Sequence, residues 1–217
     1  MVVAIDGPAG SGKSTVAKMV ALQLGFSLVD TGAIYRCVAL AAQRKSLDLS
    51  DGGPIGQLAS AIKIRFVTSG SGQRVFLDDE DVSELIREPE ISQAASQVSA
   101  HPQVRKALLE TQRELGRDGG VVLEGRDIGT VVFPDAEVKV FLVAPDEVRA
   151  QRRFDELQAR GKKVSFEETL EEMQLRDRRD ASRATAPLKP AQDAIIVETG
   201  TLSIQEVTAR IIELVRQ

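Results

Sequence analysis

The chain has 217 residues, of which 28 are basic and 32 acidic, giving a net charge of −4. This acidic balance argues against a general nucleic-acid surface, and the 42% hydrophobic content argues against disorder. The length favours one domain with an insertion. No apolar run approaches the roughly 18 residues that cross a bilayer, and residues 1–6 do not resemble a secretory signal. We therefore expect a cytoplasmic protein that binds no membrane.

Two further features of the composition narrow the class of protein. Cys37 is the only cysteine, which excludes an internal disulfide, and its place in a helical pattern predicts a buried structural thiol. The basic residues are 19 arginines and 9 lysines, a bias that favours a phosphate ligand. No extended apolar face is left over, so we expect a monomer.

Strands alternate with helices along most of the chain. Apolar runs that suit buried strands occur at 2–6 (VVAID), 26–30 (FSLVD), 120–125 (GVVLEG), 137–144 (EVKVFLVA) and 194–198 (AIIVE). Helical patterns follow several of them, at 33–45, 146–160, 165–183 and 203–216. This alternation predicts an α/β fold with a parallel sheet core flanked by helices.

One segment breaks this alternation. The runs AIKIRFV and QRVFLDD flank the turn-rich TSGSG at 68–72, a pattern typical of an antiparallel hairpin. We place a small inserted β subdomain at about residues 47–85.

The strongest chemical motif is GPAGSGKS at 7–14, which matches G-x-x-x-x-G-K-[ST] between an expected strand and an expected helix. Its glycines let backbone N–H groups surround phosphates. Lys13 can reach the β- and γ-phosphates, and the Ser14 hydroxyl can face Mg²⁺. The alternative is an ordinary Gly/Ser turn, but the complete motif in this context predicts a bound nucleoside triphosphate.

The fate of the γ-phosphate depends on other residues. The chain contains no asparagine, so it cannot carry the N-K-x-D-type motif with which switch GTPases read guanine. Arginines occur instead on several expected helices, and they can neutralise the repulsion between two anionic groups held in line. This distribution favours a phosphotransferase.

Five segments together resemble bacterial cytidylate kinases in order and spacing over nearly the whole chain. They are GPAGSGKST at 7–15, DTGAIYR at 30–36, AASQVSAHPQVR at 94–105, EGRDIGTVVFPDA at 124–136 and RDRRDASRATAPL at 176–188. The resemblance implies a P-loop nucleoside monophosphate kinase that transfers phosphate from ATP, with Mg²⁺, to CMP or dCMP. It also implies a single domain with a core (about 1–30, 115–145 and 184–217), a monophosphate-binding region with the β insert (about 31–114) and a helical lid (about 146–183).

The same resemblance implies residue roles. ATP would be held by Gly7, Pro8, Ala9, Gly10, Ser11, Gly12, Lys13, Ser14 and Thr15, and by Arg152 and Arg153 of the lid. Cytosine would be read by Ser96, Arg105 and Asp127. The monophosphate would be held by Arg36 and Arg126, and the sugar by Thr31, Arg176 and Asp180. Lys13, Arg126 and Arg183 would carry catalysis. One segment, ETGTLS at 198–203, departs from the family pattern and leaves the adenine contacts open.

Each role has a simpler alternative. Ser96 could be an ordinary polar helix position and Asp127 a turn residue. Arg36 could lie on a solvated helix face, and Arg126 could pair with Glu124 or Asp127. Glu124 ends a strand where P-loop proteins often keep an acid near Mg²⁺.

The lid arginines and the segment RDRRDASR at 176–183 are described by helical spacing. Arg149, Arg152 and Arg153 fall on one face. In 176–183, Arg176, Asp180 and Arg183 share a face with Arg179 at its edge, whereas Asp177, Arg178 and Ser182 are expected on a solvated, ion-paired surface.

Two other functions stay open at this stage. A related kinase could phosphorylate UMP or a non-nucleotide alcohol. Alternatively, a nucleotide-gated switch could use the P-loop without phosphate transfer.

Overall fold

The computed structural model describes residues 1–69 and 72–216. Its internal contacts divide the chain into two units, each described by itself: Met1–Leu28 with Gly119–Gln217, and Val29–Asp118. The first unit is thus assembled from two segments distant in sequence. Over the described residues, no helix combines the length and apolarity needed to cross a membrane. The predicted division into core, monophosphate-binding region and lid stays a prediction.

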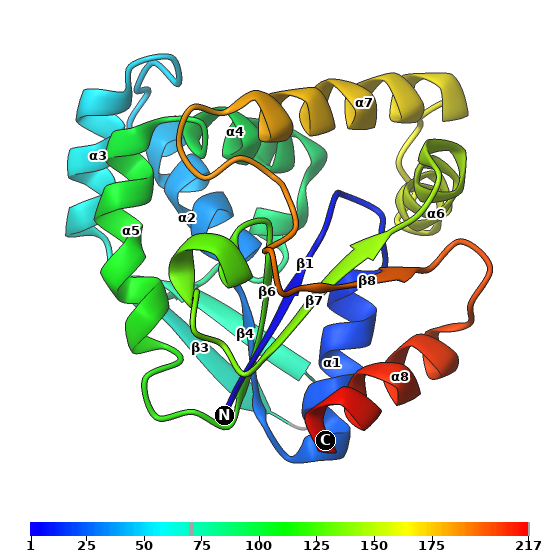
Figure 1. The fold of residues 1–217 in the computed structure, drawn as a ribbon. Helices are drawn as coiled ribbons and strands as arrows, with labels where there is room; N and C mark the ends of the chain where they lie inside the picture. Colours follow the sequence, from blue (N-terminus) through cyan, green and yellow to red (C-terminus); the bar gives the residue numbers. More distant parts are fainter. Residues whose placement is uncertain (70–71, 217) are drawn as a thin grey trace. The chain divides into compact units, whose positions relative to one another are not determined.

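In the described part of the first unit, five strands form a sheet in the order β2-β6-β1-β7-β8 (Figure 1). The strands are β1 (Val2–Asp6), β2 (Ser27–Asp30), β6 (Val121–Gly125), β7 (Val138–Val143) and β8 (Ile195–Glu198); β2 continues into the second unit. β1 pairs in parallel with β6 and β7, and β7 pairs in parallel with β8. The predicted α/β fold with a parallel sheet core is confirmed.

The helices of the first unit are α1 (Lys13–Leu24), α6 (Asp146–Ala159), α7 (Phe166–Ser182), α8 (Ile204–Arg216) and the short π-helix η2 (Ile128–Val132). α1 and α8 lie side by side against the sheet (Figure 1), and their apolar faces share one core with β1, β6, β7 and β8. Val16, Val20 and Ile211 are fully or almost fully buried there. A capping box of Ser165 and Glu168 begins α7 and explains where this helix starts.

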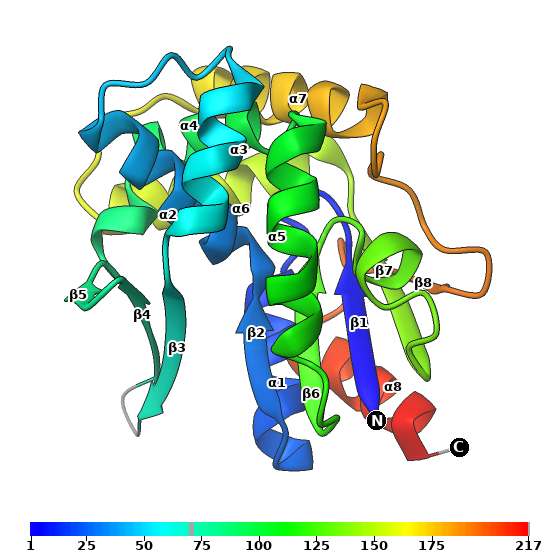
Figure 2. The same cartoon turned by 90° about the vertical axis from the view of Figure 1, so that its left-hand side faces the viewer.

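The second unit contains four α-helices and a small antiparallel sheet within its described residues (Figure 2). They are α2 (Thr31–Arg44), α3 (Gly52–Ala61), α4 (Pro89–Val98) and α5 (Pro102–Glu114), with β3 (Ile64–Ser69), β4 (Gly72–Leu77), β5 (Glu80–Asp81) and the 3-10 helix η1 (Leu85–Arg87). β3 pairs antiparallel with β4, which confirms the predicted hairpin; residues 70–71 of its turn lie outside the described residues. The sequence did not predict α3 or β5.

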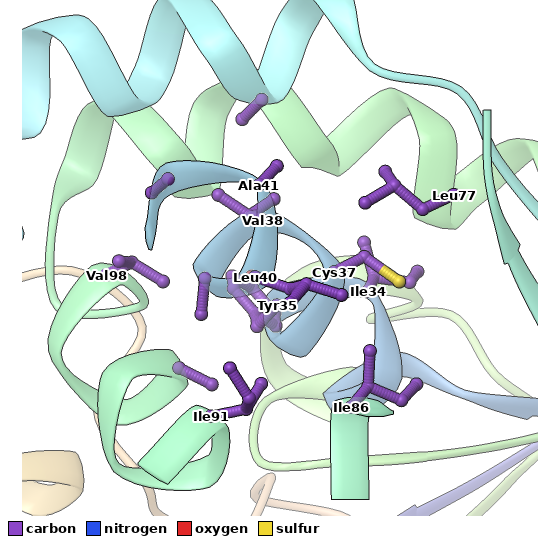
Figure 3. Packing of buried hydrophobic residues seen from close by; sticks show 14 of the residues in the cluster. Ile34, Tyr35, Cys37, Val38, Leu40, Ala41, Leu77, Ile86, Ile91 and Val98 are labelled. Atoms are coloured by element: carbon purple, nitrogen blue, oxygen red, sulfur yellow. The ribbon is translucent and has the colours of Figure 1, made fainter. Parts of the chain in front are cut away.

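The core of the second unit surrounds α2 (Figure 3). Ile34, Cys37 and Val38 are completely buried, and Ile86 and Val98 pack around them from η1 and α4. Burial raises the pKa of the Cys37 thiol to about 12. Because the thiolate is the nucleophilic form, Cys37 has the structural role predicted for it.

Candidate functional site

The glycine-rich loop 7–12 joins β1 to α1 in the first unit. Gly7 and Gly10 have φ values of 148° and 71°, which side-chain-bearing residues rarely adopt. A Cβ on Gly7 would lie 2.3 Å from the Leu142 carbonyl oxygen, and one on Gly10 would lie 2.9 Å from the Cβ of Arg149. Both positions therefore require glycine, because the loop lies directly against β7 and α6.

Lys13, the first residue of α1, is buried beneath this loop. Its Nζ donates to the Pro8 carbonyl oxygen at 2.6 Å and lies 3.4 Å from the Ser11 hydroxyl. Burial and then the charge of Arg126 lower the pKa of Lys13 well below its ordinary value, whereas Glu124 and Asp6 raise it. An anionic phosphate beside Lys13 would favour the charged ammonium.

Ser14 and Glu124 bring two oxygen atoms together beside the loop. The Ser14 hydroxyl donates to Oε2 of Glu124 at 2.8 Å, and Glu124 is 4% exposed at the end of β6. Hydroxyl and carboxylate oxygens are ligands that Mg²⁺ prefers. This pair is therefore chemically suited to a magnesium ion.

Asp6 is a buried carboxylate that the sequence did not single out as a site residue. Its two oxygens accept the backbone N–H groups of Ile128 at 2.9 Å and Gly129 at 2.8 Å. These amides directly follow Asp127, so the end of β1 fixes the backbone that carries Asp127. The sequence signal that could have identified Asp6 is its position: it is an acidic residue at the end of an apolar strand, directly before the P-loop.

The Asp6 carboxyl should make stability depend on pH. Burial raises its pKa from 3.8 to about 6, even though the amides of Gly129 and Ile128 lower it. Because the pKa of Asp6 is higher in the folded state than in the unfolded state, its titration costs no folding stability below about pH 4. As the pH rises from there through about 6, the folded protein loses stability relative to the unfolded chain. We expect the unfolding free energy of the wild type, relative to Asp6→Asn, to fall by about 3 kcal/mol over this range and then level off.

Urea unfolding of both proteins from pH 4 to pH 8 measures this difference. The contributions of all other titratable groups to the unfolding free energy are shared by the two proteins and largely cancel in the difference. A difference that stays constant across the range would contradict a raised pKa for Asp6.

An arginine cluster surrounds Asp180 near the end of α7. Asp180 is 2% exposed; its Oδ2 lies 3.2 Å from Nε of Arg126, and its Oδ1 lies 3.6 Å from a terminal guanidinium nitrogen of Arg183. Burial alone would raise the pKa of Asp180, but Arg126, Arg176 and Arg183 hold it below its ordinary value. Three guanidinium groups around one carboxylate leave an excess of positive charge, which suits an anionic ligand.

The structure refines the prediction for residues 176–183. α7 ends at Ser182, and Arg183 follows it with extended backbone angles. Arg178 and Ser182 are exposed as predicted. Asp177 is ion-paired as predicted, but its side chain is only 20% exposed, and its carboxylate accepts from the buried Arg149 at 2.6 Å. Helical spacing did not reveal that α6 packs along this side of α7.

The three arginines of α6 that the sequence analysis placed on one face occupy different environments. Arg149 is 4% exposed, whereas Arg153 forms a partly exposed pair with Glu156 at 2.8 Å. Arg152 donates to the carbonyl oxygen of Thr199 at 2.6 Å and to its hydroxyl at 3.2 Å. Their shared face on a helical wheel did not predict these differences.

Four of the predicted acceptor-binding residues belong to the second unit. Thr31 and Ser96 are each 3% exposed. Arg36 forms a 2.6 Å ion pair with Asp30, whose other oxygen accepts the Ala33 N–H and so begins α2. Arg36 is thus partly buried and paired, rather than fully solvated.

Arg105 is held rigidly within the same unit. It is 7% exposed, and its guanidinium lies 5.3 Å from the centre of the Tyr35 ring. It also donates to the Ser99 carbonyl oxygen at 3.2 Å. A buried guanidinium fixed in this way has a defined orientation.

The parallel sheet, the glycine loop after its central strand and the lysine at the start of α1 define a P-loop nucleotide-binding protein. A crystal structure of an uncharacterised protein from Eubacterium ventriosum shares this fold, with a TM-score of 0.56 and 13% identity over 100% of this chain and 99% of that one.

Sequence comparison identifies the family. The model of the cytidylate kinase family matches residues 3–217. A cytidylate kinase from Syntrophotalea carbinolica is 48% identical over 217 residues, covering 100% of this chain and 92% of the relative. A cytidylate kinase from Pasteurella multocida is 45% identical over 217 residues, covering 100% and 96%. The chain belongs to the cytidylate kinase family and is an ATP-dependent kinase.

Proposed function

We propose that this protein transfers the γ-phosphate of ATP to CMP or dCMP, giving ADP and CDP or dCDP, as a step of pyrimidine nucleotide metabolism. The match to the cytidylate kinase family over residues 3–217 carries this proposal. The buried Lys13 and the arginine cluster around Asp180 supply the positive charge that two phosphate chains require. Nucleotides, rather than a nucleic-acid polymer, are its proposed partners.

The phosphates of ATP are proposed to bind the backbone N–H groups of residues 7–15 and the Lys13 ammonium. Mg²⁺ is proposed to bind beside Ser14, whose hydroxyl lies 2.8 Å from Glu124, and would neutralise charge on the β- and γ-phosphates. Arg152 and Arg153 are proposed to contact ATP from α6, since each guanidinium has donors beyond those its protein partners use.

Cytosine is proposed to be read by Ser96, Arg105 and Asp127. A carboxylate accepts from the exocyclic amine of cytosine, while a hydroxyl or a guanidinium donates to its carbonyl edge. Uracil would place a carbonyl opposite Asp127, leaving two acceptors facing each other. The hydrogen bonds that Asp6 accepts from the backbone N–H groups of Ile128 and Gly129 support a defined position for Asp127.

The monophosphate is proposed to bind Arg36 and Arg126, with Arg183 placed between the two phosphate chains. Thr31, Arg176 and Asp180 are proposed to bind the sugar. Arg126 is already oriented by Asp180 at 3.2 Å, so it needs little reorganisation when an anion binds.

The reaction needs no general base on the protein. The attacking phosphate oxygen of the acceptor is ionised near neutral pH, so catalysis consists of positioning and charge neutralisation by Lys13, Arg126 and Arg183. The α6–α7 pair is proposed to close over ATP and exclude water, which would otherwise accept the phosphate. We also propose that the enzyme acts as a monomer in the cytoplasm, where its nucleotide substrates are made and used.

A coupled assay of ADP production with CMP, dCMP, UMP, AMP or GMP as acceptor tests the proposed function. We expect activity with CMP and dCMP well above that with the other three. Preference for another acceptor would favour a related kinase, and tight diphosphate binding without transfer would favour a nucleotide switch.

Asp127→Ala tests base recognition in the same assay. We expect kcat/KM for CMP to fall by about 10- to 100-fold because the hydrogen bond to the amine is lost, and preference over UMP to shrink. Asp135→Ala, at an exposed position, serves as the control. An unchanged preference in Asp127→Ala would remove Asp127 from base recognition.

A further inference from the structure

Arg149 is the most completely bonded arginine of the lid, and neither the sequence motifs nor the proposed mechanism gives it a role. Its guanidinium donates to the carbonyl oxygens of Ala144 at 3.0 Å and Ala9 at 2.8 Å. It also donates to the carboxylates of Asp146 at 2.5 Å and Asp177 at 2.6 Å. The buried Arg149 side chain therefore connects α6 and α7 to the middle of the P-loop through hydrogen bonds.

The Ala9 carbonyl is the first of three successive P-loop carbonyls with donors from outside the loop. Nitrogen NH1 of Arg152 lies 3.5 Å from the Gly10 oxygen. The Thr199 hydroxyl donates to the Ser11 oxygen at 3.0 Å, and Thr199 is 3% exposed at the end of β8. α6 and the residue after β8 thus contact three consecutive peptide groups.

Because the peptide bond is planar, a contact that fixes the direction of a carbonyl also fixes the direction of the N–H group in the same peptide. No cis peptide bond occurs among the described residues, and in a trans peptide the C=O and N–H point in opposite directions. Donors that hold the carbonyls of residues 9, 10 and 11 therefore turn the N–H groups of residues 10, 11 and 12 away from themselves. P-loops bind phosphate through backbone N–H groups of this kind.

We propose that Arg149 and Thr199 are positioning residues that preorganise the phosphate-binding amides of the P-loop from its outer side. Arg149 makes the strongest of these contacts, because its charged guanidinium donates at 2.8 Å, whereas Arg152 lies 3.5 Å from its carbonyl and the Thr199 hydroxyl is neutral. Asp146 and Asp177 hold its guanidinium in place, so the shape of the loop depends on the α6–α7 pair. This inference rests on the proposed binding of ATP phosphates by the loop and does not depend on the acceptor.

The binding of ATP and of inorganic tripolyphosphate, both with magnesium, tests this role by calorimetry on the full chain. Tripolyphosphate carries no base or sugar, so it isolates the phosphate-binding amides. We expect Arg149→Gln to weaken both ligands by a similar factor of at least about tenfold, and Thr199→Val to weaken both by a smaller factor. Arg178→Gln, at an exposed position, should leave both affinities unchanged.

Two results would overturn the proposal: wild-type affinity for both ligands in Arg149→Gln and Thr199→Val, or a loss for ATP without a loss for tripolyphosphate. If Arg149→Gln does not fold, as judged by circular dichroism, the nearly isosteric Thr199→Val decides the outcome. Arg149→Lys should restore affinity only in part, because one ammonium cannot span the four acceptors. These binding measurements contain no CMP. They would therefore still test the roles of Arg149 and Thr199 if the protein proved not to phosphorylate CMP.

Discussion

Lys13→Met is expected to lower kcat by about a thousandfold while the protein remains folded. Lys13 is 6% exposed, and its ammonium lies 2.6 Å from the Pro8 carbonyl oxygen, at the base of the phosphate loop. In such a water-poor site, a fixed positive charge stabilises the charge that develops on the transferring phosphoryl group far better than it could in water. Methionine keeps most of the volume and removes the charge.

The fold should tolerate this change because Lys13 is costly to bury in the absence of a phosphate. Burial and then Arg126 lower the pKa of its ammonium, so replacement by an apolar side chain removes an unfavourable charge. Steady-state kinetics with thermal melts measure both effects, and Lys18→Met, exposed on the same helix, is the control. A kcat within tenfold of the wild type in a folded Lys13→Met protein would contradict the catalytic role of Lys13.

Arg183→Ala is expected to lower kcat by about a hundredfold or more. Arg183 is 8% exposed just after the end of α7 and lies 3.6 Å from Asp180, within the cluster of excess positive charge. A guanidinium placed between two phosphate chains reduces their repulsion most in the transition state, so its removal should affect kcat more than KM.

The fold should survive this substitution because Asp180 keeps Arg126, which lies 3.2 Å away. Arg183→Lys should recover part of the activity, and Arg178→Ala, exposed on α7, should behave as the wild type. If Arg183 only paired with Asp180, Arg183→Ala would melt at a lower temperature but turn over at nearly the wild-type rate.

The two substitutions probe different parts of the same unit. Lys13 belongs to the P-loop and Arg183 follows the helix α7, yet Arg126 and Arg176 act on the pKa of both Lys13 and Asp180. The combined variant should therefore be less than additive in kcat, as is usual for groups that act on the same phosphoryl group.

The helix α3 shows why local sequence misled one part of the fold prediction. Its sequence, GGPIGQLASA, contains three glycines and a proline, which usually indicate a loop. In the structure, a Cβ on Gly52 would lie 2.8 Å from His101, and one on Gly56 would lie 2.8 Å from Gln103. The glycines therefore permit close packing of α3 against α5, and buried Ile55 and Leu58 outweigh the poor helix propensity.

In the candidate site, too, some features could be predicted from the sequence and others could not. The sequence predicted the P-loop, the strand before it and the helix after it, because the motif is contiguous and its conformation depends on adjacent residues. It could not distinguish Arg149, Arg152 and Arg153, which have the same residue type and share a helical face. Their roles differ because β8, α7 and the P-loop approach that face at different points.

The sequence by itself determined most of the strands and helices, though not α3 or β5, together with the parallel sheet, the phosphate loop and, through five separate segments, the family. These features follow from hydrophobic periodicity and from short-range backbone constraints, which nearby residues set. Only the tertiary structure decided which charged groups are buried and which partners they have: Asp6 beneath the amides that follow Asp127, Asp177 beside Arg149, and Arg149 against the Ala9 carbonyl. Burial and pairing depend on the packing of segments distant in the chain, and no local pattern records that packing.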